Sequence, residues 1–224
     1  GHEVLDPSWT QYDREADYVT FDVTRQVKKG LNALGVTLGN GFYYVPAVRK
    51  RYHKLMVEYG YPSVICLVKI RYTDGSEKNI VTDRSWKTTR GPVVFSSVYG
   101  GEDFDARMEQ PGWNKPGFRD RGWKSPVVVQ GPPVLEARVE DPVRVFEHFN
   151  ATTSHELSPG AWVFDMGQNA AGIPEITLQG GASWDTVRIT PAEVVDSVGR
   201  ISQRGSGGPS YFTYVLRGNG KVDW

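Results

Sequence analysis

Short stretches of alternating and β-branched residues, separated by glycine and proline turns, run through the whole chain. Asp74-Gly75, between two such stretches, is a strong hairpin signal. Many short strands at this spacing, with 25 Gly and 14 Pro available for turns, predict an all-β fold of antiparallel β-sandwich or jelly-roll domains, and evidence for helices is thin. The strands are expected at 18–23, 32–38, 63–72, 78–82, 93–98, 143–149, 161–164, 175–178, 186–190 and 211–216.

The segment Gly131-Pro132-Pro133 predicts a boundary between two domains, 1–131 and 132–224. Two prolines in a row form a stiff, extended connector with few donors for a strand ladder. A new set of strands begins after this connector. We expect the second domain to be truncated at its end, because 221–224 lies within an ongoing β-region.

The composition of the chain favours carbohydrate over nucleic acid as a partner. The net charge is zero, since 26 basic residues balance 26 acidic ones, and such a chain lacks the field that binds a phosphate backbone. No run approaches 18 apolar residues, so no membrane span is expected. Seven Trp and eleven Tyr suit sugars, whose apolar C–H faces stack on aromatic rings while their hydroxyls need fixed polar partners.

The densest group of carboxylates comprises Glu102, Asp103, Asp105 and Glu109. Catalysis there would require one carboxyl whose pKa is raised by an apolar setting. In a strand, Asp103 and Asp105 would lie on one face and Glu102 on the other. We interpret the group as a solvated or salt-bridged strand, with Arg107 or Arg119 as a salt-bridge partner. A structural calcium ion is the alternative, although no contiguous ligand loop is visible. We assign no catalytic residue and expect no required cofactor.

Four residues of the first half are candidates for contacts with a sugar. The turn Gly39-Asn40-Gly41 presents an amide beside an aromatic pair, and Asp13 lies in a loop. Trp113 follows a glycine and could stack on a sugar ring, although a tryptophan in such a place also serves as a plug at the end of a sandwich. The carbohydrate-binding candidates are Asp13, Asn40, Tyr43 and Trp113.

Several segments, in a shared order along the chain, resemble the bacterial α-L-rhamnosidase family. The segment 5–12 resembles the L-x-P-x-W-T-x-Y motif of this family. The segment 30–41 resembles its G-x-N-A-x-G-x-x-L-G-x-G run. The resemblance continues through 21–24, 83–87, 91–92, 99–102, 105–107, 165–172 and 191–193.

The resemblance implies a jelly-roll module similar to galactose-binding domains, followed by a concanavalin-like β-sandwich. It also implies an inverting hydrolase that removes terminal α-L-rhamnosyl residues from plant polysaccharides or glycosides, with its catalytic acid and base in a following α/α barrel. Nothing in this chain resembles that barrel. The chain is therefore expected to be an accessory region that supports the missing barrel of the same polypeptide and binds rhamnose-containing glycans.

The contact surface for that barrel is expected in the second half of the chain. The alternative for Asp165 and Asn169 is a local role, because Asp and Asn in a turn usually bond to nearby backbone groups. For Glu193 the alternative is a solvated side chain. The candidates for the interface are Asp165, Gln168, Asn169 and Glu193.

Three other interpretations remain. The chain could be a free-standing carbohydrate-binding module, a purely structural scaffold, or an unfamiliar glycosidase that uses Glu102 or Asp105. No signal peptide is visible and the single cysteine, Cys66, does not identify a compartment. The substrate class favours a periplasmic or secreted location.

Overall fold

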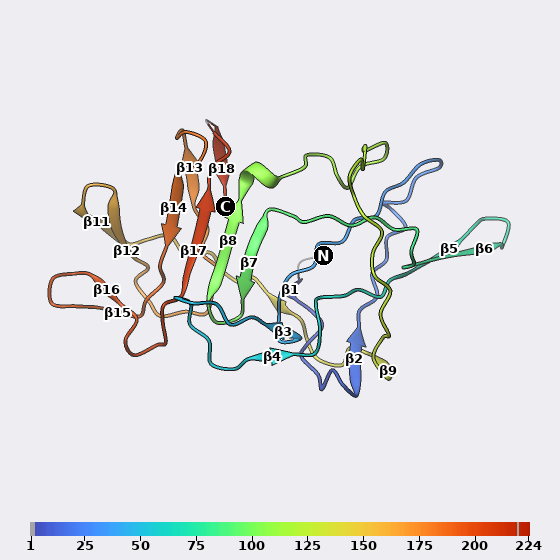
Figure 1. The fold of residues 1–224 in the computed structure, drawn as a ribbon, viewed down its shortest axis with the longest axis horizontal. Helices are drawn as coiled ribbons and strands as arrows, with labels where there is room; N and C mark the ends of the chain where they lie inside the picture. Colours follow the sequence, from blue (N-terminus) through green and yellow to red (C-terminus); the bar gives the residue numbers. More distant parts are fainter. Residues whose placement is uncertain (1–2, 219) are drawn as a thin grey trace.

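The computed structural model describes residues 3–218 and 220–224 (Figure 1). These residues form eighteen short strands and a single 3₁₀ helix, η1 (Ala106–Met108), so the predicted all-β class is confirmed. No helix in the described residues is long and apolar enough to cross a membrane. The strands are β1 (Glu3–Leu5), β2 (Glu15–Tyr18), β3 (Tyr44–Val45), β4 (Val57–Glu58), β5 (Leu67–Arg71), β6 (Glu77–Val81), β7 (Val93–Ser97), β8 (Gly101–Asp105), β9 (Val134–Ala137), β10 (Val143–Arg144), β11 (Thr153–Ser158), β12 (Ala161–Asp165), β13 (Thr177–Gln179), β14 (Thr186–Ile189), β15 (Val194–Val195), β16 (Ile201–Ser202), β17 (Tyr211–Val215) and β18 (Lys221–Asp223).

A four-stranded sheet with the order β14-β17-β8-β7 occupies the middle of the molecule (Figure 1). The outer pairs β14–β17 and β7–β8 are antiparallel, but β8 and β17 run parallel. The pair β2–β9 is also parallel, which differs from the purely antiparallel pairing expected. Parallel neighbours need a long connection, and both pairs join strands that are far apart in the chain.

The core lies against this sheet. Ala106, Tyr214 and Leu216 are buried, and the ring of Phe104 stacks on that of Tyr214 with centroids 5.3 Å apart. Tyr214 and Phe104 are direct partners in the parallel pair, so their rings meet on one face. Trp224 covers Tyr214 from the end of the chain, at 5.1 Å between centroids.

The Asp74-Gly75 turn joins β5 to β6 as predicted. Gly75 takes the positive φ of 83° that a tight turn requires, and the carboxylate of Asp74 accepts hydrogen bonds from the Ser76 N–H at 2.9 Å and the Ser76 hydroxyl at 2.6 Å. This hairpin extends from one end of the molecule, while the β11–β12 and β15–β16 pairs lie at the other end (Figure 1).

The strand predicted at 32–38 is absent, although this segment is described throughout. The side chain of Asn32 instead closes a local loop, donating to the Lys28 carbonyl at 2.7 Å and accepting from the Lys28 N–H at 2.9 Å. Gly35 lies directly under Trp113, so close that an added Cβ would be 2.2 Å from a ring carbon. The segment therefore packs on a side chain rather than pairing with a strand.

Other predicted strands differ in extent. The predicted strands 18–23 and 143–149 are largely wrong, because β2 ends at Tyr18 and β10 covers only Val143–Arg144. The remaining predicted strands are present, with bounds shifted by a few residues.

Three strand pairs join segments on opposite sides of Gly131. They are β1–β10, β2–β9 and β8–β17. The division into 1–131 and 132–224 stays a prediction.

Candidate functional site

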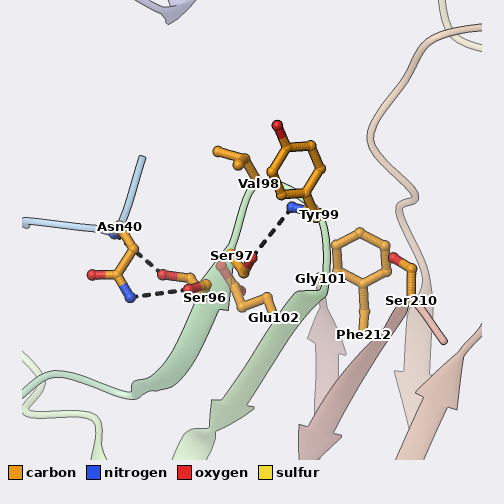
Figure 2. A pocket seen from close by; sticks show the side chains of 9 residues that line it. All are labelled: Asn40, Ser96, Ser97, Val98, Tyr99, Gly101, Glu102, Ser210 and Phe212. Atoms are coloured by element: carbon orange, nitrogen blue, oxygen red, sulfur yellow. Dashed lines mark hydrogen bonds between the residues drawn. The ribbon is translucent and has the colours of Figure 1, made fainter. Parts of the chain in front are cut away.

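A hollow of about 260 Å³ opens where β7 and β8 meet the start of β17 (Figure 2). Hydroxyl, amide and carboxylate groups line it together with two aromatic rings. This mixture suits a sugar, because convergent polar groups bind hydroxyls while an apolar surface contacts the ring. The lining residues are Asn40, Ser96, Ser97, Val98, Tyr99, Gly101, Glu102, Ser210 and Phe212.

Asn40 is fixed against β7 by two hydrogen bonds to Ser96. Its backbone N–H donates to the Ser96 hydroxyl at 3.2 Å, and its side-chain nitrogen donates to the Ser96 carbonyl at 2.9 Å (Figure 2). The amide oxygen of Asn40 has no partner among the described residues, so it is available to accept a hydrogen bond from a ligand hydroxyl. The sequence predicted this amide beside the aromatic pair Phe42-Tyr43, but the rings in the lining are those of Tyr99 and Phe212.

Glu102 supplies the carboxylate of the hollow. It lies opposite Phe212 in the parallel pair β8–β17. Burial raises the pKa of Glu102, and the neighbouring Asp103 raises it further. Within the described chain Glu102 has no ion-pair partner, while Asp103 is bonded to Arg51. A half-buried carboxylate without a cation is available to accept hydrogen bonds from donors that a ligand brings.

Replacing Glu102 with glutamine is expected to stabilise the protein at neutral pH. Burial penalises the charged carboxylate, and the raised pKa means that this penalty grows as the pH rises from the ordinary value of 4.5 through the pKa of the folded state. The variant should therefore have a higher free energy of unfolding than the unmodified chain at about pH 7, and this difference should be absent well below pH 4.5. Urea unfolding at both pH values measures it.

Glu77→Gln is the matched control, since Arg71 and then Lys69 lower the pKa of Glu77. This control should lose stability at neutral pH, and the loss should fade as the pH falls through the depressed pKa. The same sign in both variants would contradict the argument.

Arg51 links two strands that border the hollow, a role that the sequence did not suggest. Its side chain is 5% exposed, and its guanidinium donates to the Gly100 carbonyl at 2.8 Å, to the Tyr211 carbonyl and to Asp103. The guanidinium also lies 3.4 Å from the centroid of the Tyr211 ring. Arg51 thus connects the residue before β8 to the first residue of β17.

Two of the four carboxylates in the acidic group, Asp103 and Asp105, form salt bridges, whereas Glu102 and Glu109 form none within the described residues. Asp105 accepts from Arg107 at 2.7 Å and 2.5 Å, and these bonds lower the pKa of Asp105. Asp103 pairs with Arg51. The alternation along β8 separates these two carboxylates from Glu102, which faces the hollow.

The other three carbohydrate-binding candidates lie elsewhere. Tyr43 packs in a cluster of tyrosines, with its ring 5.8 Å from that of Tyr59. Asp13 is exposed in the turn that precedes β2. Trp113 lines a second hollow. Of the four candidates, all within the described residues, only Asn40 lines the first hollow, so their shared role in sugar binding stays a prediction.

The four interface candidates are all exposed. The carboxylate of Asp165 accepts from the Gly167 N–H at 2.7 Å and so closes a local turn after β12. This bond does not exclude a contact with a partner, because the surrounding surface is open. The roles of Asp165, Gln168, Asn169 and Glu193 stay predictions.

The described residues contain no group of three or more His, Cys, Asp or Glu side chains that could hold a metal ion.

Comparison with known proteins decides the family. Residues 1–147 match the α-L-rhamnosidase N-terminal domain, and residues 155–224 match the bacterial α-L-rhamnosidase concanavalin-like domain. The chain belongs to the α-L-rhamnosidase family. It corresponds to the accessory β-region of that family, as the order of its motifs predicted.

Relatives of this α-L-rhamnosidase region are several times longer. The chain is 32% identical to an α-L-rhamnosidase of Formosa agariphila and 34% identical to one of Streptomyces avermitilis. These alignments cover 100% and 99% of the chain but only 24% and 21% of the relatives. The chain thus spans between a fifth and a quarter of the length of these curated relatives.

Solved α-L-rhamnosidase structures have the same fold. The Streptomyces avermitilis enzyme complexed with L-rhamnose matches with a TM-score of 0.86 at 30% identity, and that of Dictyoglumus thermophilum with 0.85 at 30%. Both matches cover 100% of the chain, against 22% and 24% of those structures.

Proposed function

We propose that this chain is part of an enzyme that hydrolyses terminal α-L-rhamnosyl residues, and that it supports the catalytic α/α barrel of the same polypeptide. The relatives it matches are named α-L-rhamnosidases and are four to five times longer than the aligned region. The chemistry belongs to the remainder of such a protein. Inverting hydrolysis needs a pair of carboxylates about 6.5–9.5 Å apart, one as acid and one as base, whereas Asp103 and Asp105 are bound to arginines.

The large exposed surface of the chain supports a scaffolding role. Its accessible area is 17555 Å², whereas a compact monomer of 25.0 kDa would expose about 10,000 Å². Bulky apolar side chains contribute to the excess, including Phe146 at 92% and Ile173 at 71% exposure. A neighbouring domain that covers such side chains would gain stability from their burial. We place its contact surface at Asp165, Gln168, Asn169 and Glu193.

We further propose that the hollow of Figure 2 binds a sugar and so holds the glycan near the barrel. The observation that carries this proposal is the meeting of Asn40, Glu102, Tyr99 and Phe212 at one end of the central sheet. An amide and a carboxylate can bond to adjacent hydroxyls, while a ring supports the apolar face of the sugar. A second binding site raises the local concentration of substrate without chemistry of its own. A structural calcium ion beside the carboxylates of β8 stays part of this proposal.

Calorimetric titration with L-rhamnose tests this site. We expect the chain to bind the sugar, and Asn40→Ala to weaken binding about tenfold, since one lost hydrogen bond is worth about 1 kcal/mol or slightly more. The titration is repeated with added calcium and with a chelator, which tests whether sugar binding depends on a structural calcium ion.

Asn79→Ala, at an exposed position on β6, is the matched control and should bind as the unmodified chain does. The melting temperatures of both variants are compared, because Asn40 also bonds to Ser96. An Asn40→Ala chain that is folded and binds undiminished would refute the site. Absence of binding in the unmodified chain would leave scaffolding as its function. Turnover of an aryl α-L-rhamnoside by the chain alone would contradict the accessory role.

A further inference from the structure

A second hollow, of about 340 Å³, lies away from the residues of the proposed rhamnose site. It is formed by the segments 32–34, 86–87 and 113–123. Four aromatic side chains contribute to its walls, those of Trp86, Trp113, Phe118 and Trp123. None of these rings takes part in the buried core of the central sheet.

Three successive turns of one kind present these rings. They are Gln110–Trp113, Lys115–Phe118 and Asp120–Trp123, and in each the N–H of the last residue donates to the carbonyl of the first, at 3.1, 3.3 and 3.0 Å. The third residue of each turn is a glycine with φ of 81°, 83° or 88°. A proline precedes this glycine in the first two turns, which is the sequence preference of a type II turn. The chain therefore places an aromatic residue at the end of each turn.

The indole rings are held in place before any ligand arrives. The indole nitrogen of Trp123 donates to the Gln110 side chain at 2.9 Å, and that of Trp86 donates to the Val81 carbonyl at 3.1 Å. A bridge between Thr88 and Lys124, with bonds of 2.8 and 2.9 Å, keeps the segments of these two tryptophans side by side. Rigid rings cost a ligand little ordering on binding.

Trp113 is held differently, with Gly35 packed directly against its ring. Its centroid lies 6.4 Å from that of Trp123. The indole N–H of Trp113 has no hydrogen-bond partner in the described chain, so it remains available as a donor.

The surroundings of these rings are strongly basic, although the whole chain is neutral. Lys87 and Lys115 line the hollow, and neither has an ion-pair partner among the described residues. Asp120 is the only acidic residue in the lining. The segments 84–90 and 113–124 together contain seven basic residues and one acidic residue. A local excess of positive charge attracts anions and selects against neutral competitors.

We propose that this second hollow binds an anionic glycan. A sugar ring would lie on the indole surface, and its carboxylate or sulfate group would lie between the ammonium groups of Lys87 and Lys115. This inference extends the proposed carbohydrate-binding role, but it concerns a different site and a charged ligand, whereas L-rhamnose is neutral.

The test uses three oligosaccharides and the 224-residue chain. The probes are an oligogalacturonide, a sulfated galactan oligosaccharide and a neutral galactan oligosaccharide. Their binding is measured by calorimetry and by the change in tryptophan fluorescence. We expect one or both anionic probes to bind and change the indole emission, and the neutral probe to bind at least about tenfold more weakly. Comparison of the anionic probes identifies carboxylate or sulfate as the preferred group. Binding should weaken between about 50 mM and about 300 mM salt.

The decisive variant is Lys87→Ala/Lys115→Ala, because both lysines are exposed and their removal should leave the fold intact. It should weaken anionic binding by about tenfold or more. The control is Lys54→Ala/Lys78→Ala, which removes two exposed lysines outside the hollow and should bind as before.

The proposal is overturned if neither anionic probe binds, if the neutral probe binds equally well, or if both double variants lose the same affinity. L-rhamnose titration of the same variants separates this site from the first one. Lys87→Ala/Lys115→Ala should retain rhamnose binding, while Asn40→Ala should retain anionic binding.

Discussion

Arg51→Ala is expected to lower the free energy of unfolding by about 3 kcal/mol, because it removes the buried member of an ion pair that also bonds two backbone carbonyls. The loss lies at the lower end of the range for such pairs, since the Asp103 side chain is 31% exposed and can be rehydrated. The cavity and the lost contacts with the Phe95 and Tyr211 rings add to it.

Urea unfolding followed by tryptophan fluorescence measures this effect. Arg49→Ala, at an exposed position two residues earlier, is the control and should change stability by less than about 0.5 kcal/mol. Arg51→Lys should recover only part of the loss, because an ammonium group cannot reproduce the planar fork of a guanidinium. Equal effects of Arg51→Ala and Arg49→Ala would show that the buried pair contributes nothing.

Gly101→Ala is expected to separate β8 from β17 and to cost at least about 3 kcal/mol. A Cβ on Gly101 would lie 2.1 Å from the Tyr211 carbonyl oxygen, and this atom belongs to the backbone of the paired strand. The φ of Gly101 is also 90°, which side chains rarely adopt. The variant should therefore lose rhamnose binding together with stability, because the hollow is built on this strand pair.

The matched control is Gly75→Ala. Gly75 has a similar φ of 83° but nothing within 4 Å of an added Cβ, so the variant tests backbone strain without a clash. It should cost only about 1–2 kcal/mol and leave sugar binding unchanged. Chemical denaturation and rhamnose titration of both variants give the comparison. Equal losses in the free energy of unfolding would show that the close approach to Tyr211 is unimportant.

The local features of the fold were predictable where short-range chemistry decides them. Asp74-Gly75 requires a tight turn, and both flanking strands follow from it. The segment 32–38 shows the limit of this reasoning. Its alternation suggested a strand, but Gly35 packs against Trp113, a residue far along the chain, and the segment has no strand partner among the described residues.

The candidate site was predictable only in part. Asn40 could be selected because a glycine on each side predicts an exposed turn. Arg51 could not be selected from the sequence, because its partners Gly100 and Tyr211 lie 49 and 160 residues away in the chain. Phe212 likewise reaches the hollow only through the parallel pairing of β17 with β8. Sequence patterns describe residues that are close together along the chain, whereas this site consists of residues from distant parts of the chain.

The parallel pair also constrains the order in which the protein can be assembled during its synthesis. Gly101 pairs with Tyr211, which a ribosome adds 110 residues later. At about 5–20 residues per second, β8 has no partner on this side for roughly 6 to 22 s after it is made. During that interval an unpaired strand edge is open to other chains. The carboxylate of Glu102, which has no ion-pair partner among the described residues, places charge on this strand and opposes its association with a second nascent copy.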